Sequence, residues 1–364
     1  MATARRSGTP RAAPPEQSVL YGIVAEVALA AERTAGTITD LMPLRAREER
    51  RRLSEARDAM EPVVHPPTPG QRPASKRSRF LRLLLLGWAA GASCLPAAPK
   101  PARLTPLRLY SIGDSITTAF DAWAPADNPA LSWVNGFHGA WEEFFDVPDI
   151  QSQNQRITAA YGSSGRKNVS AAENGARWDD ALDQAQGVIT RAPSYVTILL
   201  GGNDVCQDSI DDLPSVAELQ GHVRATLDFL DLSLPAGATV VVAGIPDLKR
   251  LHDVAIVEKG LLGIDCEAIW ATTALGFPCG SMLSSDNSES DRLFVQSLNF
   301  AYNDTIRTAV NAKNASSRRV YYQFVDLEPV PYTGEHISSI DCFHPSADGQ
   351  QLLSALIWNA GPFD

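Results

Sequence analysis

The chain has 364 residues, of which 44% are hydrophobic and 20% are charged, a composition typical of a soluble globular protein. The formal net charge of -10 argues against nucleic acid as a partner, because contacts with phosphates need a basic surface. The length allows one large domain or two ordinary ones.

The first part of the chain differs in composition from the rest. Residues 1–82 are rich in Arg, Pro and Ala and include the stretch RAREERRRLSEAR, whereas most of the acidic excess lies beyond residue 105. This asymmetry predicts that residues 1–75 are not part of the folded domain. We expect them to be disordered, or to lie upstream of a true start at or near Met60.

Residues 76–104 have the three parts of an export signal, followed by a linker rich in Pro and Ala. A basic segment at residues 76–79 precedes an apolar core at residues 80–90, and small residues come next. The apolar run is too short to span a bilayer, since a spanning helix needs about 20 apolar residues. We therefore expect a protein secreted by a bacterium or held in its envelope, with a lipid anchor at Cys94 as the lesser alternative.

Beyond residue 104, short apolar runs alternate with amphipathic stretches. The runs are typical of strands buried on both faces and cover residues 107–112, 195–200, 239–244 and 320–325, with a weaker candidate at 156–160. The stretches have helical spacing and cover residues 133–145, 176–190, 216–233, 290–311 and 347–359. This alternation predicts one domain over residues 105–364, a three-layer α/β/α sandwich with a mainly parallel central sheet. Residues 279–291 are expected to form an exposed loop.

Four cysteines lie in this domain: Cys206, Cys266, Cys279 and Cys342. An even number in an exported chain predicts two disulfides. Three pairings are open, and the short loop between Cys266 and Cys279 favours joining those two, which leaves Cys206 for Cys342. Free buried thiols are the alternative.

Three polar clusters adjoin these elements. GDSIT follows the first strand, GGND follows the strand at 195–200, and DCFHPS precedes the last helix. Because the carboxyl ends of parallel strands meet at one edge of a sheet, we expect the first two clusters to share that edge. The third can reach it if the last helix packs back on the sheet.

The residue types in these clusters suit nucleophilic catalysis. Ser115 needs a base to take its proton, and a histidine such as His344 can do so near neutral pH. Asp341 lies three residues before His344 and can fix its tautomer. The amide of Asn203 can donate a hydrogen bond to a developing oxyanion. Because the sequence holds no P-loop, dinucleotide, H-E-x-x-H or paired C-x-x-C pattern, we expect neither metal nor organic cofactor.

With these residues the chain resembles the GDSL, or SGNH, hydrolases. That family carries Gly-Asp-Ser after the first strand, a glycine in a second block, Gly-x-Asn-Asp in a third and Asp-x-x-His in the last. The matching blocks occur here in order, at Gly113–Ser115, Gly175, Gly201–Asp204 and Asp341–His344. The strings GDSITTAFDAW, YVTILLGGNDVC and DCFHPSADGQ resemble a bacterial secreted branch related to phospholipase B. Ile116 stands where the name of the family has Leu.

The resemblance implies a flavodoxin-like SGNH fold and a role for each of these residues. Ser115 is expected to be the nucleophile and to lend its backbone N–H to the oxyanion hole. Gly175 would give a second N–H, with Gly162 and Gly165 as nearby alternatives, and Asn203 a third donor. His344 would act as general base, oriented by Asp341.

We therefore expect a secreted serine ester hydrolase, that is, an esterase or a lipase, with a phospholipase-like enzyme as one form of it. Its substrate would be a small-molecule or lipid ester, with peripheral contact to a membrane or lipid as an option, and the protein would be a monomer. A carbohydrate-directed acetylesterase, an acyltransferase, or a non-catalytic protein that binds lipid or glycan are the alternatives. Core packing is the simpler interpretation of Trp123 and Trp133, and lining an acyl pocket is the other.

Overall fold

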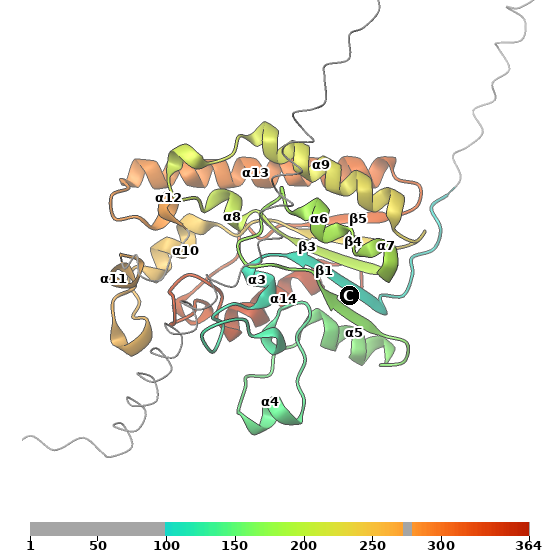
Figure 1. Cartoon of the computed structure of the whole chain (residues 1–364), viewed down its shortest axis with the longest axis horizontal. Helices are drawn as coiled ribbons and strands as arrows, with labels where there is room; N and C mark the ends of the chain where they lie inside the picture. Colours follow the sequence, from blue (N-terminus) through green and yellow to red (C-terminus); the bar gives the residue numbers. More distant parts are fainter. Residues whose placement is uncertain (1–98, 272–278, 364) are drawn as a thin grey trace, which may run out of the picture. The chain divides into compact units, whose positions relative to one another are not determined.

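The computed structural model describes residues 99–271 and 279–363. The export signal, the start near Met60 and the lipid site at Cys94 lie outside these ranges and stay predictions. The described chain forms a five-stranded parallel sheet with the order β2-β1-β3-β4-β5 (Figure 1). Its strands are β1 (Arg108–Gly113), β2 (Lys167–Ser170), β3 (Tyr195–Leu199), β4 (Thr239–Ala243) and β5 (Tyr321–Val325).

Four of these strands confirm the predicted ones to within a residue at each end, and the weak candidate is wrong. Residues 156–160 lie in helix α5 (Gln153–Tyr161), not in a strand. The helix is fixed by a capping box in which the Ser152 hydroxyl accepts the N–H of Gln155 while the Gln155 side chain accepts that of Ser152. The missed strand, β2, is a short polar edge strand without an apolar run.

Side chains alternate between the two faces of the sheet, and helices cover both faces. From β1, Tyr110 and Ile112 pack into a core shared with α6, α9 and α13, whereas Leu109 packs on the opposite face with α5 and α14. Figure 1 shows α9 and α13 on one side of the sheet and α5 and α14 on the other. This arrangement is the predicted three-layer α/β/α sandwich.

The helices differ greatly in length. Besides α5, the longer ones are α9 (Val216–Ser233), α13 (Glu289–Ser316), α14 (Ala347–Asn359) and α10 (Leu248–Ala255). The short ones are α3 (Ser115–Thr118), α4 (Ala140–Phe144), α6 (Ala181–Ala185), α7 (Val188–Arg191), α8 (Gly202–Val205), α11 (Cys266–Trp270) and α12 (Gly280–Leu283), with 3₁₀ turns η2 (Pro129–Leu131), η3 (Ile210–Asp212), η4 (Leu261–Gly263) and η6 (Gly334–His336). The structure confirms the predicted helices at 216–233 and 347–359, and extends the one at 290–311.

Two predicted helices are wrong in extent, and a closely packed glycine lies outside the helical turns in each. Of residues 133–145 only α4 is helical, and a Cβ at Gly136 would lie 2.6 Å from the carbonyl oxygen of Ala130. Residues 176–190 hold α6 and the start of α7, separated by Gly187. A Cβ at Gly187 would lie 2.2 Å from the Tyr110 hydroxyl, so the chain there passes close to β1.

The predicted disulfide pairing is wrong as well. The bonds join Cys206 to Cys279 and Cys266 to Cys342, with Cα separations of 4.2 and 5.5 Å. The expected exposed loop at 279–291 is in part a buried segment, because α12 packs beside the chain that follows β3. Nearness in sequence therefore gave the wrong partners. The two disulfides indicate an extracellular or otherwise oxidising environment.

Candidate active site

The sheet brings the first two polar clusters to one edge. β1 and β3 are neighbours, and Gly113 at the end of β1 pairs with Leu199 at the end of β3. The chain after each strand starts a short helix, so Ser115 opens α3 and Asn203 lies in α8. Both side chains line the same cavity, as expected for the carboxyl ends of parallel strands.

The turn that presents Ser115 is held by its neighbours. The Asp114 carboxylate caps α3 by accepting the N–H of Ile116 at 2.9 Å. Gln184 accepts the N–H of Gly113 at 2.9 Å and donates to its carbonyl oxygen at 3.0 Å. A Cβ at Gly113 would lie 2.2 Å from the Thr117 hydroxyl oxygen, so only glycine fits there.

His344 lies between Ser115 and Asp341. Its Nε2 is 2.8 Å from Ser115 Oγ, and its Nδ1 is hydrogen-bonded to Asp341 Oδ2. Asp341 Oδ1 accepts the N–H groups of Phe343 and His344 at 2.9 and 3.0 Å, which fixes the carboxylate. The rings of Phe120 and Phe343 pack edge-on against His344. This geometry can pass the serine proton to the imidazole.

The electrostatics favour a basic imidazole. Burial disfavours the charged form of His344, but the hydrogen bond and charge of Asp341, with the charges of Asp121 and Asp114, hold its pKa above the ordinary value. Burial raises the pKa of Asp114 to about 7 and that of Asp204 to about 7. Nothing in the sequence had pointed to Asp121, which is buried beside the Asp341 loop.

Asn203 contacts the residue that follows Gly175. The Asn203 amide donates to the carbonyl oxygen of Ala176 at 2.9 Å, which brings its side chain to the residue after Gly175. Gly175 lies beyond the carboxyl end of β2 and has a φ of 80°. The alternatives, Gly162 and Gly165, lie before β2 and hence at the opposite edge of the sheet.

The cavity beside Ser115 has largely apolar walls. Its apolar lining comes from Ile116, Pro246, Leu248, Leu251, Tyr332 and Phe343. Most of these residues could not be singled out from the sequence, because they lie in loops and in α10, outside the matching blocks. Trp133 is fully buried in the core and Trp123 is half exposed, and neither lines this cavity. Within residues 99–271 and 279–363, no cluster of His, Cys, Asp or Glu could hold a metal ion.

Two curated proteins share sequence with this chain. Acyloxyacyl hydrolase of Mus musculus is 24% identical over 251 residues, which cover 63% of this chain and 43% of that protein. Membrane-associated phospholipase B1 of Rattus norvegicus is 26% identical over 196 residues, 46% of this chain and 14% of that protein. The chain therefore spans less than half the length of either relative.

A solved structure from Parabacteroides merdae, described as a GDSL-like lipase, is 15% identical, with a TM-score of 0.42 over 72% of this chain and 98% of that one. Residues 109–357 match the sequence profile of the GDSL-like lipase/acylhydrolase family. That match takes in the sheet, both clusters at its edge and the loop that carries His344. On this ground the chain belongs to the GDSL-like lipase/acylhydrolase family.

Proposed function

We propose that the chain is an exported serine ester hydrolase that works through an acyl-enzyme on Ser115. The observation that carries the proposal is the 2.8 Å contact between His344 Nε2 and Ser115 Oγ, with Asp341 on the other ring nitrogen. Family membership and the oxidising environment indicated by the disulfides agree with it.

In this mechanism His344 takes the proton of Ser115 as Oγ attacks the carbonyl carbon of the ester. The imidazolium, stabilised by Asp341, then protonates the leaving alcohol. Water repeats the sequence on the acyl-enzyme: His344 accepts its proton, hydroxide adds to the acyl carbon, and Ser115 leaves with the proton returned by His344.

Three donors would stabilise the tetrahedral oxyanion. The N–H of Ser115 lies in the first turn of α3, where backbone donors lack partners within the helix. Gly175 would give the second N–H. The Asn203 amide has two hydrogens, and its bond to Ala176 uses one and fixes the direction of the other.

We propose a lipid ester as the substrate. The apolar cavity walls beside Ser115 suit an acyl chain, because burying such a chain gains about 0.8 kcal/mol per CH₂ group. The named activities of the two relatives, an acyloxyacyl hydrolase and a phospholipase B, point in the same direction. A carbohydrate-directed acetylesterase would need only a site for a two-carbon acyl group.

An exposed aromatic patch, formed by Trp141, Phe144 and Phe145, supports peripheral contact with a lipid surface. These side chains are 73%, 75% and 58% exposed and touch one another, and α4, which carries two of them, lies at the end of a loop that leaves the sheet (Figure 1). Trp and Phe partition well into bilayer interfaces. The neighbouring Glu142 and Glu143 would disfavour anionic lipids, so we expect contact with zwitterionic ones.

Ser115→Ala tests the proposal directly. The folded variant should lose p-nitrophenyl ester hydrolysis by about 10³-fold or more, and wild type should be labelled by a fluorophosphonate that leaves the variant unlabelled. Retained turnover would end the mechanism. A wild-type protein that is inert to both ester and label would favour a non-catalytic binding protein.

The substrate class needs its own comparison. The candidate substrate classes are separated by comparing kcat/KM for esters of increasing acyl length, for a phosphatidylcholine and for an acetylated sugar. A kcat/KM that rises with chain length supports the lipid ester. Activity confined to acetyl groups favours the carbohydrate acetylesterase, and transfer of the acyl group to an added alcohol in preference to water favours the acyltransferase.

A further inference from the structure

Both disulfides start beside residues of the candidate site. Cys206 ends α8, three residues after Asn203, and Cys342 lies between Asp341 and His344. Their partners, Cys279 and Cys266, both lie in the part of the chain between α10 and α13. That part is therefore tied covalently to two of the loops that make the site.

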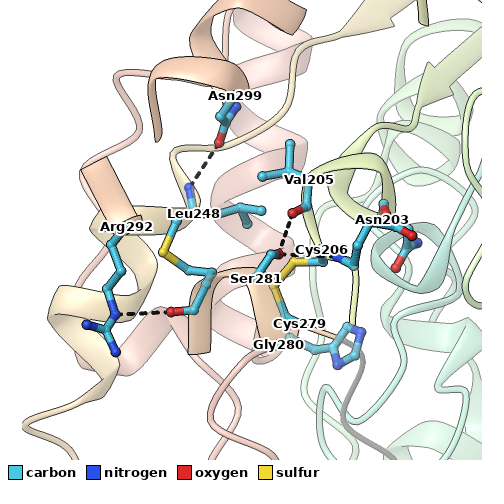
Figure 2. The surroundings of a disulfide bond; sticks show 12 residues. Asn203, Val205, Cys206, Leu248, Cys279, Gly280, Ser281, Arg292 and Asn299 are labelled. Carbon is cyan, nitrogen blue, oxygen red and sulfur yellow. Dashed lines mark hydrogen bonds between the residues drawn. A yellow bond between two sulfur atoms is a disulfide. The ribbon is translucent and has the colours of Figure 1, made fainter. Parts of the chain in front are cut away.

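The bond between Cys206 and Cys279 is backed by other contacts. Beside it, the Ser281 hydroxyl donates to the carbonyl oxygen of Val205 at 2.7 Å (Figure 2). The N–H of Ser281 donates to the carbonyl oxygen of Gln207 at 2.9 Å. Arg292 on α13 donates to the carbonyl oxygen of Met282 at 3.1 Å. Losing this disulfide would leave the two segments joined by hydrogen bonds.

Arg292 holds the same segment at two further points. Its guanidinium also donates to the carbonyl oxygens of Asn287 and Ser284, each at 2.8 Å. A Cβ at Gly280 would lie 2.0 Å from the carbonyl oxygen of Asp208, so the segment also packs tightly against the chain after Cys206. α12 thus stays in place by several independent contacts.

Apolar packing surrounds the bond between Cys266 and Cys342: a Cβ at Gly260 would lie 2.7 Å from Cys342 Sγ and 2.2 Å from Ile269 Cδ1. Cys342 has a φ of 58°, a left-handed backbone that a residue with a Cβ adopts only at a cost. Hydrogen bonds close the loop around it and anchor the start of the loop: the N–H of Cys342 donates to the carbonyl oxygen of Ser338 at 2.9 Å, and that of Ser338 to the carbonyl oxygen of His344 at 2.8 Å. The Ser338 hydroxyl also donates to the carbonyl oxygen of Asp121 at 2.6 Å. α11 contacts Cys342 through the disulfide and through apolar packing.

α11 is itself seated on the wall of the cavity. Trp270, at its end, stacks on His252 of α10 with ring centroids 5.5 Å apart. The same Trp270 packs in a cluster that holds Leu251 and Phe343, and both of these line the cavity. The disulfide therefore joins Cys342 to α11, a helix that is itself packed against the wall of the cavity.

We propose that the disulfide between Cys266 and Cys342 is a positioning element of the reaction, which keeps His344 in register with Ser115, and that the disulfide between Cys206 and Cys279 is dispensable for turnover. The proposal rests on the proposed function. Without the tether, Cys342 is free to leave the left-handed region, and the peptide units on either side turn with it. Asp341 and His344 are its two nearest neighbours in the catalytic set, so their alignment is lost first.

A matched pair of double variants tests this: C266A/C342A against C206A/C279A. For the first, we expect kcat on p-nitrophenyl butyrate to fall on the order of 10²-fold with KM nearly unchanged, because a shift of about 1 Å in a reacting group has that effect. For the second, kcat should stay within about threefold of wild type. Near-UV circular dichroism gives the folded fraction, so kcat is compared per folded molecule.

The pH profile separates positioning from a merely structural role. Loosening the Asp341 contact lets the pKa of His344 drop back, so the acidic limb of kcat/KM in C266A/C342A should move to lower pH. The variant C266A/C342G also lacks the disulfide, but its glycine adopts a left-handed backbone freely at position 342. We expect it to recover at least part of the kcat that C266A/C342A loses.

Equal kcat in both double variants, or equal loss in both, would overturn the proposal, as would a C266A/C342A enzyme whose pH profile matches wild type. If C266A/C342A does not fold, C266A/C342G is the test instead. A folded C266A/C342G with a kcat equal to that of wild type and an unshifted pH profile would then count against positioning. Loss of the proposed function looks different, since wild type would be inactive or Ser115→Ala would stay active.

Discussion

Replacing Asp341 by Asn tests how the carboxylate prepares the histidine. Oδ1 of Asp341 accepts two backbone N–H groups, from Phe343 and His344, and Oδ2 faces His344 Nδ1. An Asn side chain should keep its oxygen on those two N–H groups, since the reverse orientation sets an NH₂ group against two donors. The amide nitrogen then donates to Nδ1, so the ring proton moves to Nε2 and His344 can no longer accept the Ser115 proton.

Because both backbone contacts survive in D341N, the loop should stay folded and the loss should be catalytic. We expect kcat to fall about 10⁴-fold, equivalent to about 5 kcal/mol in the activation free energy, as the wrong tautomer does in other serine triads. Steady-state kinetics on a p-nitrophenyl ester measures the loss, and thermal melts check the fold. Asp341→Ala is the control, since it also removes the acceptor for Phe343 and should lower Tm as well. A folded D341N within tenfold of wild type would refute the reasoning.

The other expectations concern the oxyanion donor, the buried carboxyls and the nucleophile turn. Asn203→Ala should lower kcat by roughly 10²–10³, whereas an effect confined to KM would assign Asn203 to substrate positioning. Asp114 and Asp204 should each contribute a decrease in the free energy of unfolding as pH rises from about 4 to about 7, because they keep protons in the folded state, with pKa values of about 7, that the unfolded chain has already released. Urea titrations across that pH range measure the free energy of unfolding, which should depend less steeply on pH in Asp204→Asn than in wild type. An unchanged pH dependence would count against a raised pKa of Asp204. Gly113→Ala, with its Cβ 2.2 Å from the Thr117 hydroxyl, should lower both Tm and activity, and an unchanged melt would show that the turn can widen. Vesicles of zwitterionic lipid should co-sediment wild type but not Trp141→Ser combined with Phe144→Ser, and equal binding would exclude the aromatic patch.

The fold was predictable because its strands carry their own signal. β1, β3 and β4 are mostly apolar and buried along nearly their whole length, and β5, although partly exposed at the other edge, still carries Tyr, Phe and Val. Each of the four is followed within two residues by Gly or Asp, and the polar clusters after β1 and β3 therefore share one edge of the sheet. β2 carries no such signal, since its residues are polar and it lies at the edge. The same reasoning made a strand of residues 156–160, where local capping by Ser152 decides for a helix.

The disulfide pairing could not be predicted for a different reason. Loop length ranks pairs by chain entropy in the unfolded state, whereas the pairing that forms is set by which segments the folded sheet brings together. Cys206 and Cys279 meet because α12 packs beside the chain after β3. No periodicity in the sequence encodes that contact.

Two glutamines that hold the backbone near Ser115 could not be identified from the sequence. Gln184 is hydrogen-bonded to both the N–H and the carbonyl oxygen of Gly113. The side chain of Gln350 on α14 is fully buried and donates to the carbonyl oxygen of Ile116 at 2.9 Å. The first fixes the strand end that carries Ser115. The second joins α3 to the helix that follows His344.

Each glutamine contacts backbone, so neither stands out by charge or by motif, yet a buried amide without a partner would be costly. These contacts explain how a serine and a histidine that are 229 residues apart stay 2.8 Å apart. In the proposed mechanism the clusters at the edge of the sheet supply the reacting groups, and these polar contacts to the backbone hold the two halves of the site in register. That division is why the residues proposed to react could be singled out from their blocks in the sequence, whereas the glutamines that hold their backbone could be identified only in the folded chain.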